Sequence, residues 1–219
     1  MVIAIDGPAG SGKTTTAKEV AKELGFIHIN TGAMYRGIAL KCLKEEILPE
    51  NESGISHILD NTTLDFGGLN KDELLLDGVN VASEITSSDV AQSASKYSTI
   101  HQIRERLVDY QRRLSHGKDV VLEGRDIGTV VFPDAEFKFF LIADVEERAK
   151  RRLKDLSAKG EKKTLNALIE EIKQRDFKDT TRKNSPLRKA EDAIEVDTTQ
   201  LSLEGQVQRI IEIVKTSIT

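Results

Sequence analysis

A glycine-rich segment near the start of the chain has the residue pattern of a phosphate-binding loop. Residues 7–14 read GPAGSGKT and fit the pattern G-x-x-x-x-G-K-[ST]. Glycines let successive backbone N–H groups point into one concavity, and a helix that follows adds the positive end of its dipole. We expect Lys13 to reach the β- and γ-phosphates of a nucleoside triphosphate and the Thr14 hydroxyl to ligate Mg²⁺. The full set expected to hold the triphosphate is Gly7, Pro8, Ala9, Gly10, Ser11, Gly12, Lys13, Thr14 and Thr15.

The sequence around this segment supplies the elements that such a loop needs. Residues 2–5 are apolar and predict a short buried strand, whereas residues 15–24 place apolar side chains on one face of a helix that ends at Gly25. The alternative is a strand–helix turn without a ligand, but lysine and threonine have no packing reason to follow such a turn. The loop predicts nucleotide binding and leaves open what happens to the nucleotide.

Charged residues follow two other predicted strands at the point where each strand ends. A strand over 26–29 leads into a helix with Thr31 as its expected N-cap and with Arg36 in its first turns. The apolar strand 119–122 leads directly into Glu123, Gly124, Arg125 and Asp126. Because open α/β sheets bind ligands at the carboxyl ends of their strands, we expect these residues to be functional. For Arg36 a solvated surface position is the alternative.

A helix predicted over about 165–182 changes character along one face. Leu168 and Ile172 lie on its inward stripe, and the same spacing continues as Arg175, Asp179 and Arg182. One interpretation is a surface pair between Arg175 and Asp179, worth only about 0.3–0.5 kcal/mol. The other, which we favour, is a helix that extends beyond the core and directs arginines at phosphates, since arginine binds phosphate oxygens bidentately.

The remaining pattern predicts an α/β fold. Strands over 137–142 and 193–196 alternate with helices over 145–156 and from 203 to 214, which implies a mostly parallel sheet with helices on both sides. Earlier in the chain, helices are predicted over 89–95 and 99–116. Residues 49–54 are expected to form a loop, and short strands over 62–66, 73–77 and 79–81, with turns at 67–70 and 77–78, predict a small β insertion. Residues 70–73 read NKDE, and we expect a turn there and not a guanine-specificity motif, because the order differs from N-K-x-D.

Composition excludes several classes of protein. The chain has 219 residues with a net charge of −4, which argues against a general nucleic-acid binder. A single cysteine, Cys42, cannot form a disulfide within the chain and is expected in the core, so a reducing compartment is predicted. No apolar run reaches membrane-spanning length, and the first strand leaves no room for a signal peptide. We therefore expect a cytoplasmic protein, with His28 as a sheet-flanking residue and not a catalyst.

Several arginines around one triphosphate loop favour phosphoryl transfer to an acceptor that already carries a phosphate. Such an acceptor needs no proton removed, which agrees with the lack of an obvious histidine base. A kinase of the same architecture for another small acceptor, such as UMP or shikimate, remains open. A nucleotide-dependent switch would need only one arginine and is disfavoured.

Several longer motifs resemble the bacterial cytidylate kinase family. They are IDGP at 5–8, NTGAMYR at 30–36, EGRDIGTVVFPDA at 123–135 and the Arg175–Asp176 pair with Arg182, and the GRD-x-GTVVFPDA part is highly specific. The resemblance covers nearly the whole chain. It implies one P-loop kinase unit, with a core over about 1–47, 89–156 and 184–219, a nucleoside-monophosphate-binding (NMP-binding) insertion over about 48–88 and a helical lid over about 157–183. We expect a monomer, since nothing in the sequence demands more.

The resemblance also implies a reaction, in which ATP with Mg²⁺ phosphorylates CMP or dCMP. The residues that would bind the acceptor or the transferring group are Thr31, Tyr35, Arg36, Ser95, Arg104, Arg125, Asp126, Arg175, Asp179 and Arg182. Within this set, Ser95, Arg104 and Asp126 would read cytosine. Arg175 and Asp179 would hold the sugar hydroxyls, and Arg36, Arg125 and Arg182 would bind phosphate. The catalytic group would be Lys13, Arg125, Asp126 and Arg182. The chain departs from the family at Asn30 and Glu123, where aspartate is frequent, and at Lys178 and Thr180, where arginine is frequent.

Overall fold

The computed structural model describes residues 1–67, 72–158 and 160–218. The chain divides into two compact units, one made of residues 1–26 and 121–219 and the other of residues 27–120. The larger sheet has five strands in the order β2-β6-β1-β7-β8. Its strands are β1 (Val2–Asp6), β2 (Ile27–Asn30), β6 (Val120–Gly124), β7 (Phe137–Ile142) and β8 (Ile194–Asp197).

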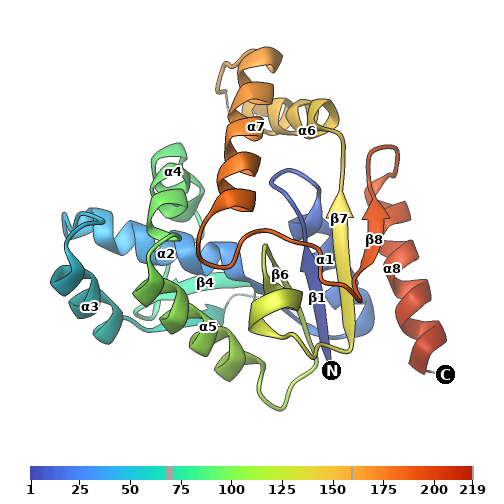
Figure 1. Ribbon diagram of the computed structural model, residues 1–219, viewed down its shortest axis with the longest axis horizontal. Helices are drawn as coiled ribbons and strands as arrows, with labels where there is room; N and C mark the ends of the chain where they lie inside the picture. Colours follow the sequence, from blue (N-terminus) through green and yellow to red (C-terminus); the bar gives the residue numbers. More distant parts are fainter. Residues whose placement is uncertain (68–71, 159, 219) are drawn as a thin grey trace. The chain divides into compact units, whose positions relative to one another are not determined.

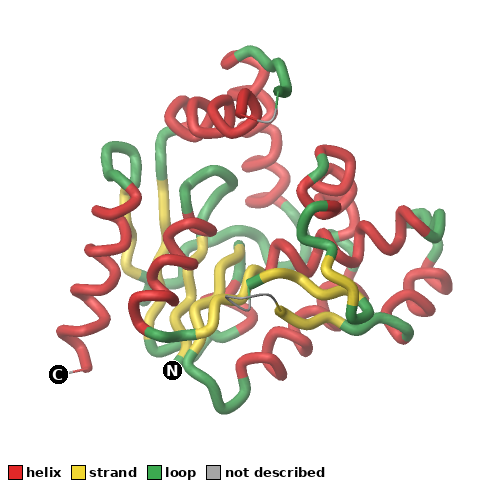
Figure 2. The backbone as a smooth tube through the Cα atoms, turned by 180° about the vertical axis from the view of Figure 1, so that it is seen from behind, coloured by secondary structure: helices red, strands yellow, loops and turns green. Residues whose placement is uncertain are grey.

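The first unit is an α/β layer structure. β1 pairs in parallel with β7, and β7 in parallel with β8, as alternation along the sequence predicts. Helices α1 (Lys13–Leu24) and α8 (Leu203–Ile218) pack against each other and share one apolar cluster with these strands. α8 runs alongside the last strand (Figure 2). Gly25 caps α1 in the left-handed conformation, which confirms the predicted end of that helix.

A helical hairpin follows β7 in the same unit. α6 (Val145–Ala158) and α7 (Leu165–Thr181) pack through a second apolar cluster that includes Ala149, Leu156, Leu168 and Ile172. Figure 1 shows the hairpin beyond the carboxyl end of β7. Ile172 is the last buried residue of α7, so the helix continues for more than two turns without an apolar core.

The second unit is built around α2 (Thr31–Lys44), which packs against α3 (Glu52–Asp60), α4 (Ser88–Tyr97), α5 (His101–Ser115) and β4 (Glu73–Leu76). β4 lies between β3 (Leu64–Gly67) and β5 (Val79–Asn80) in an antiparallel sheet, so the three short strands are confirmed. A short helical turn, η1 (Glu84–Thr86), precedes α4. The expected turn at 67–70 and the NKDE segment at 70–73 fall largely on residues 68–71, outside the described residues.

Two sequence predictions in this unit are wrong. Residues 52–54 are not a loop but the first turn of α3, whose side chains Ile55, Ile58 and Leu59 are buried. The N-cap of α2 is Asn30 and not Thr31, because the Asn30 side chain accepts a hydrogen bond from the Ala33 backbone N–H at 2.8 Å. Cys42 and His28 are buried, in α2 and β2 respectively, as predicted.

Candidate functional site

The glycine-rich loop at residues 7–12 is held in a conformation that only glycine adopts easily. Gly12 has φ 89° and directly precedes α1, and Gly7 has φ 150°. A side chain at Gly7 would place its Cβ 2.2 Å from the carbonyl oxygen of Leu141 in β7, so the loop and that strand approach too closely for any other residue. The predicted strand–loop–helix context is therefore present, with α1 starting at Lys13 and not at Thr15.

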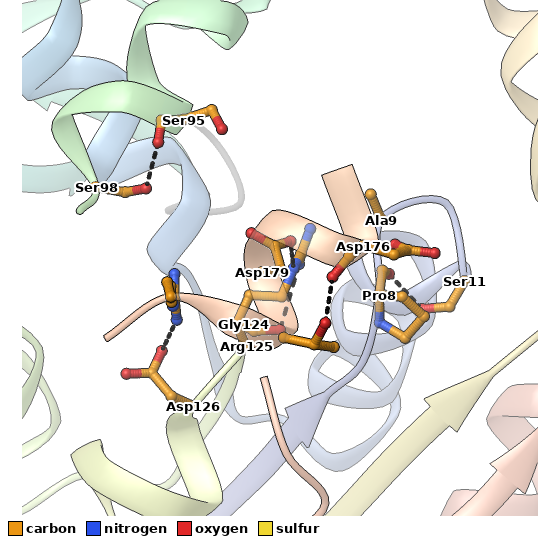
Figure 3. A network of polar contacts seen from close by, with 12 residues as sticks. Pro8, Ala9, Ser11, Ser95, Ser98, Gly124, Arg125, Asp126, Asp176 and Asp179 are labelled. Atoms are coloured by element: carbon orange, nitrogen blue, oxygen red, sulfur yellow. Dashed lines mark hydrogen bonds and ion pairs between the residues drawn. The ribbon is translucent and has the colours of Figure 1, made fainter. Parts of the chain in front are cut away.

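Lys13 lies inside the loop that it is expected to serve. Its side chain is buried, and its Nζ donates a hydrogen bond to the Pro8 carbonyl at 2.9 Å, while the Ser11 hydroxyl donates to the same oxygen at 3.0 Å (Figure 3 labels Pro8 and Ser11). Burial, and after it the positive charge of Arg125, lower the pKa of Lys13 from 10.5 to about 7. A phosphate group placed here would favour the charged ammonium and would replace the Pro8 carbonyl as its partner.

Side chains far along the chain brace this loop from outside. The Thr16 hydroxyl donates to Gln206 Oε1 at 2.8 Å, and the Thr198 hydroxyl donates to the Ser11 carbonyl at 3.0 Å. The Arg148 guanidinium donates to the Ala9 carbonyl at 3.1 Å. All three supporting contacts were missed by sequence reasoning, because no local spacing links residues 9–16 with residues 148–206.

The two threonines at the start of α1 have different surroundings. The Thr15 hydroxyl donates to the Gly12 carbonyl at 3.0 Å, whereas Thr14 is exposed. Among the described residues no group of three or more His, Cys, Asp or Glu side chains could hold a metal ion. Mg²⁺ is commonly held by one or two protein oxygens together with substrate phosphates. An accessible Thr14 hydroxyl fits an ion of that kind, which would arrive with the triphosphate.

Asp6, at the end of β1, fixes the segment that follows β6. Its two carboxylate oxygens accept hydrogen bonds from the backbone N–H groups of Ile127 at 2.9 Å and Gly128 at 2.8 Å. These residues open η2 (Ile127–Val131), a turn with a hydrogen bond from the Phe132 N–H to the Ile127 carbonyl. Asp6 therefore ties the strand before the phosphate loop to the residues directly after Arg125 and Asp126, a role that sequence reasoning did not assign.

The titration of Asp6 gives a testable pH dependence. Burial raises the pKa of Asp6 from 3.8 to about 6, against the lowering effect of the two backbone hydrogen bonds. Because the folded chain holds this proton more tightly, the group stabilises the fold below pH 3.8, and that contribution is lost as pH rises through about 6. At about 1.4 kcal/mol per pKa unit, the total change is about 3 kcal/mol.

Asp6→Asn removes this titration. We expect the wild type to lose about 3 kcal/mol in free energy of unfolding, relative to the variant, between about pH 3.5 and about pH 7. Urea unfolding of both proteins across that pH range measures this loss. A difference that stays constant over the range would contradict the buried titration.

The charged face of α7 binds to the strand-end residues of the same unit. Asp179 Oδ2 pairs with Arg125 Nε at 2.8 Å (Figure 3), and Arg182 Nη2 lies 3.5 Å from Asp126 Oδ1. Burial would raise the pKa of Asp179, but the charges of Arg125, Arg175 and Arg182 outweigh it and hold the pKa below its usual value. The interpretation of Asp179 as half of a solvated surface pair is therefore wrong, since its carboxylate is largely buried against Arg125.

The second unit gathers a smaller group of predicted residues. Arg104 is buried, with only 4% of its surface exposed, and its guanidinium lies over the Tyr35 ring at 5.6 Å from the ring centre. Its Nη1 donates to the Ser98 carbonyl at 3.3 Å, and the Ser98 hydroxyl donates to the Ser95 carbonyl at 3.1 Å. Thr31 is buried at the start of α2, and Arg36 is partly exposed next to Tyr35.

Comparisons with known proteins agree over nearly the whole chain. The model of the cytidylate kinase family matches residues 3–216. A cytidylate kinase of Caldanaerobacter subterraneus is 49% identical over 213 residues, covering 97% of this chain and 94% of its own length. One of Clostridium perfringens is 44% identical over 210 residues, covering 96% and 95%.

A solved structure extends the comparison to the fold. An uncharacterized protein of Eubacterium ventriosum superimposes with a TM-score of 0.53 at 14% identity over 98% of each chain, which supports the fold alone. The family match and the two relatives support more than the fold, because each runs over almost every residue described above. The chain belongs to the cytidylate kinase family.

Proposed function

We propose that this chain transfers the γ-phosphoryl group of ATP to CMP or dCMP, giving CDP or dCDP. The observation that carries the proposal is the concentration of Lys13, Arg125 and Arg182 in one unit with a single phosphate loop, in a chain related to cytidylate kinases over 97% of its length. A triphosphate needs one such loop, and further arginines suit a second phosphorylated ligand.

ATP is the proposed ligand of the loop at residues 7–15. The loop's backbone N–H groups and the start of α1 would bind the phosphates, and Lys13 would move from the Pro8 carbonyl to the β- and γ-phosphates. Mg²⁺, held by Thr14 and the phosphates, would neutralise charge on the transferring group. Arg125 and Arg182 would stabilise the charge that spreads over the phosphoryl oxygens, so the protein needs no general base.

The acceptor is proposed to be a cytosine nucleotide. Cytosine presents an amino donor where uracil presents a carbonyl, so an ionised Asp126 accepts from the first and repels the second. Ser95 and Arg104 complete the proposed reading of the base. Arg36 binds the acceptor phosphate, and Arg175 and Asp179 bind the sugar hydroxyls, whereas Thr31 and Tyr35 support the same ligand.

We propose the corresponding division of labour along the chain. Residues of about 1–47, 89–156 and 184–219 form the core, about 48–88 the NMP-binding insertion and about 157–183 a lid that excludes water during transfer. The chain is proposed to act as a cytoplasmic monomer on small nucleotides and not on nucleic acid. Among the residues that the structure describes, no helix is long and apolar enough to cross a membrane.

An acceptor panel tests the proposal. Purified protein with ATP and Mg²⁺ is expected to phosphorylate CMP and dCMP with kcat/KM at least about 10²-fold above UMP, AMP and dTMP, because a mismatched base leaves buried polar groups unpaired. ADP release with each acceptor, measured by a coupled assay, decides the question. Preference for UMP would assign the chain to a kinase for another nucleoside monophosphate, and ATP hydrolysis without any acceptor would indicate a switch.

A further inference from the structure

Three ion pairs hold the second half of α7 at nearly even intervals. Asp176 pairs with Arg148 at 2.7 Å, Asp179 with Arg125 at 2.8 Å, and Arg182 at the end of the helix lies 3.5 Å from Asp126. The last two pairs use residues that the proposed function gives to the nucleotides. The first pair uses Arg148 and Asp176, to which nothing so far assigns a role in the reaction.

Arg148 connects three parts of the first unit with one guanidinium group. Its Nη2 pairs with Asp176 of α7, its Nη1 donates to the Ala9 carbonyl of the phosphate loop at 3.1 Å, and its Nε donates to the Ala143 carbonyl after β7 at 3.0 Å. The Arg148 side chain is only 7% exposed. A buried guanidinium with three separate acceptors has one orientation available, so the three parts are fixed relative to one another.

The second half of α7 depends on polar contacts, because the buried apolar residues of the helix lie in its first half. The cluster shared by α6 and α7 ends at Ile172, the last buried residue of the helix. Beyond Ile172 the position of α7 depends on its charged side chains. Arg175, Asp179 and Arg182 all follow this point.

Phosphate binding is expected to weaken two of these three ion pairs. When phosphates arrive, guanidinium donors of Arg125 and Arg182 turn to phosphate oxygens, so each arginine divides its donors between phosphate and carboxylate. The pairs with Asp179 and Asp126 are then loosened together. Arg148 and Asp176 bind no nucleotide in the proposed function, so their pair can stay intact while the other two change partners.

We propose that Arg148 is a positioning residue that acts through Asp176 and the Ala9 carbonyl. It holds the charged half of α7 at a fixed place relative to the phosphate loop, so that arginines released from their carboxylates meet the transferring phosphoryl group. This inference rests on the proposed function. A purely structural role is the competing account, and it predicts lower stability with unchanged turnover per folded molecule.

The test compares Arg148→Lys and Asp176→Asn with wild type. Lysine keeps the charge but has no planar fork to bind three acceptors, so kcat is expected to fall about 10- to 100-fold. Asp176→Asn should lower kcat about 10-fold or more and leave the affinity for a non-hydrolysable ATP analogue within about threefold, since Arg148 keeps its bond to Ala9. Arg148→Lys should weaken that affinity as well. The matched control is Lys173→Gln, which breaks an exposed pair with Glu170 on the same helix.

The measurements are kcat and KM with the best acceptor of the wild type, analogue binding by calorimetry, and melting temperature. Lower kcat in both variants, with wild-type values in the control, supports the proposal. Unchanged kcat in folded variants, or an equal loss in Lys173→Gln, overturns it. Should Arg148→Lys not fold, Asp176→Asn decides alone. Failure of the proposed function would appear in a different measurement, namely the acceptor that the wild type prefers. The analogue-binding measurement needs no acceptor and therefore tests Arg148 independently of the proposed function.

Discussion

Replacing Lys13 with alanine is expected to lower kcat for phosphoryl transfer by about 10³-fold, because the variant loses the cation that meets the transferring group in the transition state. Lys13 is buried inside the phosphate loop, and its Nζ gives up a hydrogen bond to the Pro8 carbonyl when a phosphate enters. We therefore expect Lys13 to stabilise mainly the transition state, in which negative charge is spread over the phosphoryl oxygens. The affinity for CMP, measured by calorimetry without ATP, should stay within about twofold of wild type.

The same helix offers a control for this variant. Lys22 is exposed near the end of α1 and pairs with Glu19, so Lys22→Ala removes an equal charge far from the loop. Its kcat should equal that of wild type. Retained turnover in Lys13→Ala would show that the lysine does not contact the transferring group, and a parallel loss of CMP affinity would indicate a collapsed site.

Replacing Asp126 with alanine is expected to lower kcat/KM for CMP by about 10²- to 10³-fold, with KM for ATP unchanged within about twofold. Asp126 is buried, and its Oδ1 lies near Arg182. The variant loses the acceptor proposed for the cytosine amino group and leaves Arg182 without that carboxylate. UMP lacks the amino donor, so its use should fall less and the preference for CMP over UMP should narrow.

Two further variants test whether the effect of Asp126→Ala comes from lost recognition of the base or merely from the loss of a charged side chain. Arg104→Met is expected to harm CMP use in the same direction, because it removes the buried guanidinium over Tyr35. Asp192→Ala breaks the pair between Asp192 and Lys138 and should leave both nucleotides unaffected. Equal losses of ATP and CMP affinity in Asp126→Ala would refute the separation of the two subsites.

The sequence predicts the regular elements well where apolar periodicity is uninterrupted. The strand 137–142 and the helix from residue 165 are found at the predicted positions, since each is marked by a continuous apolar run or stripe. α3 was missed although Ile55, Ile58 and Leu59 have helical spacing, because proline, asparagine, serine and glycine at 49–54 are typical of a loop. Asn51 is in fact the cap of that helix and accepts from the Gly54 N–H.

Hydrogen bonds and ion pairs between residues far apart in the chain could not be predicted in the same way. Helical spacing offered Arg175 as the partner of Asp179, whereas the carboxylate binds Arg125, which lies 54 positions away in the chain. Asp6 lies in the IDGP motif, but nothing in that motif indicates its partners, and Arg148 has no distinguishing local pattern. The packed structure shows their contacts with Ile127, Gly128 and Ala9. Motif and family resemblance located the candidate chemistry, but they did not indicate what braces it.

The carboxylates that occupy Arg125 and Arg182 have a consequence for selectivity among anions. Any incoming anion competes with the carboxylates of Asp179 and Asp126 for these two arginines. A simple inorganic ion therefore gains little binding free energy, because its contacts with the arginines replace contacts of similar strength. A nucleotide brings a base and a sugar whose additional contacts can offset that exchange. The chain thus carries its own internal counterions, which should keep orthophosphate and sulfate from blocking the guanidinium groups between turnovers.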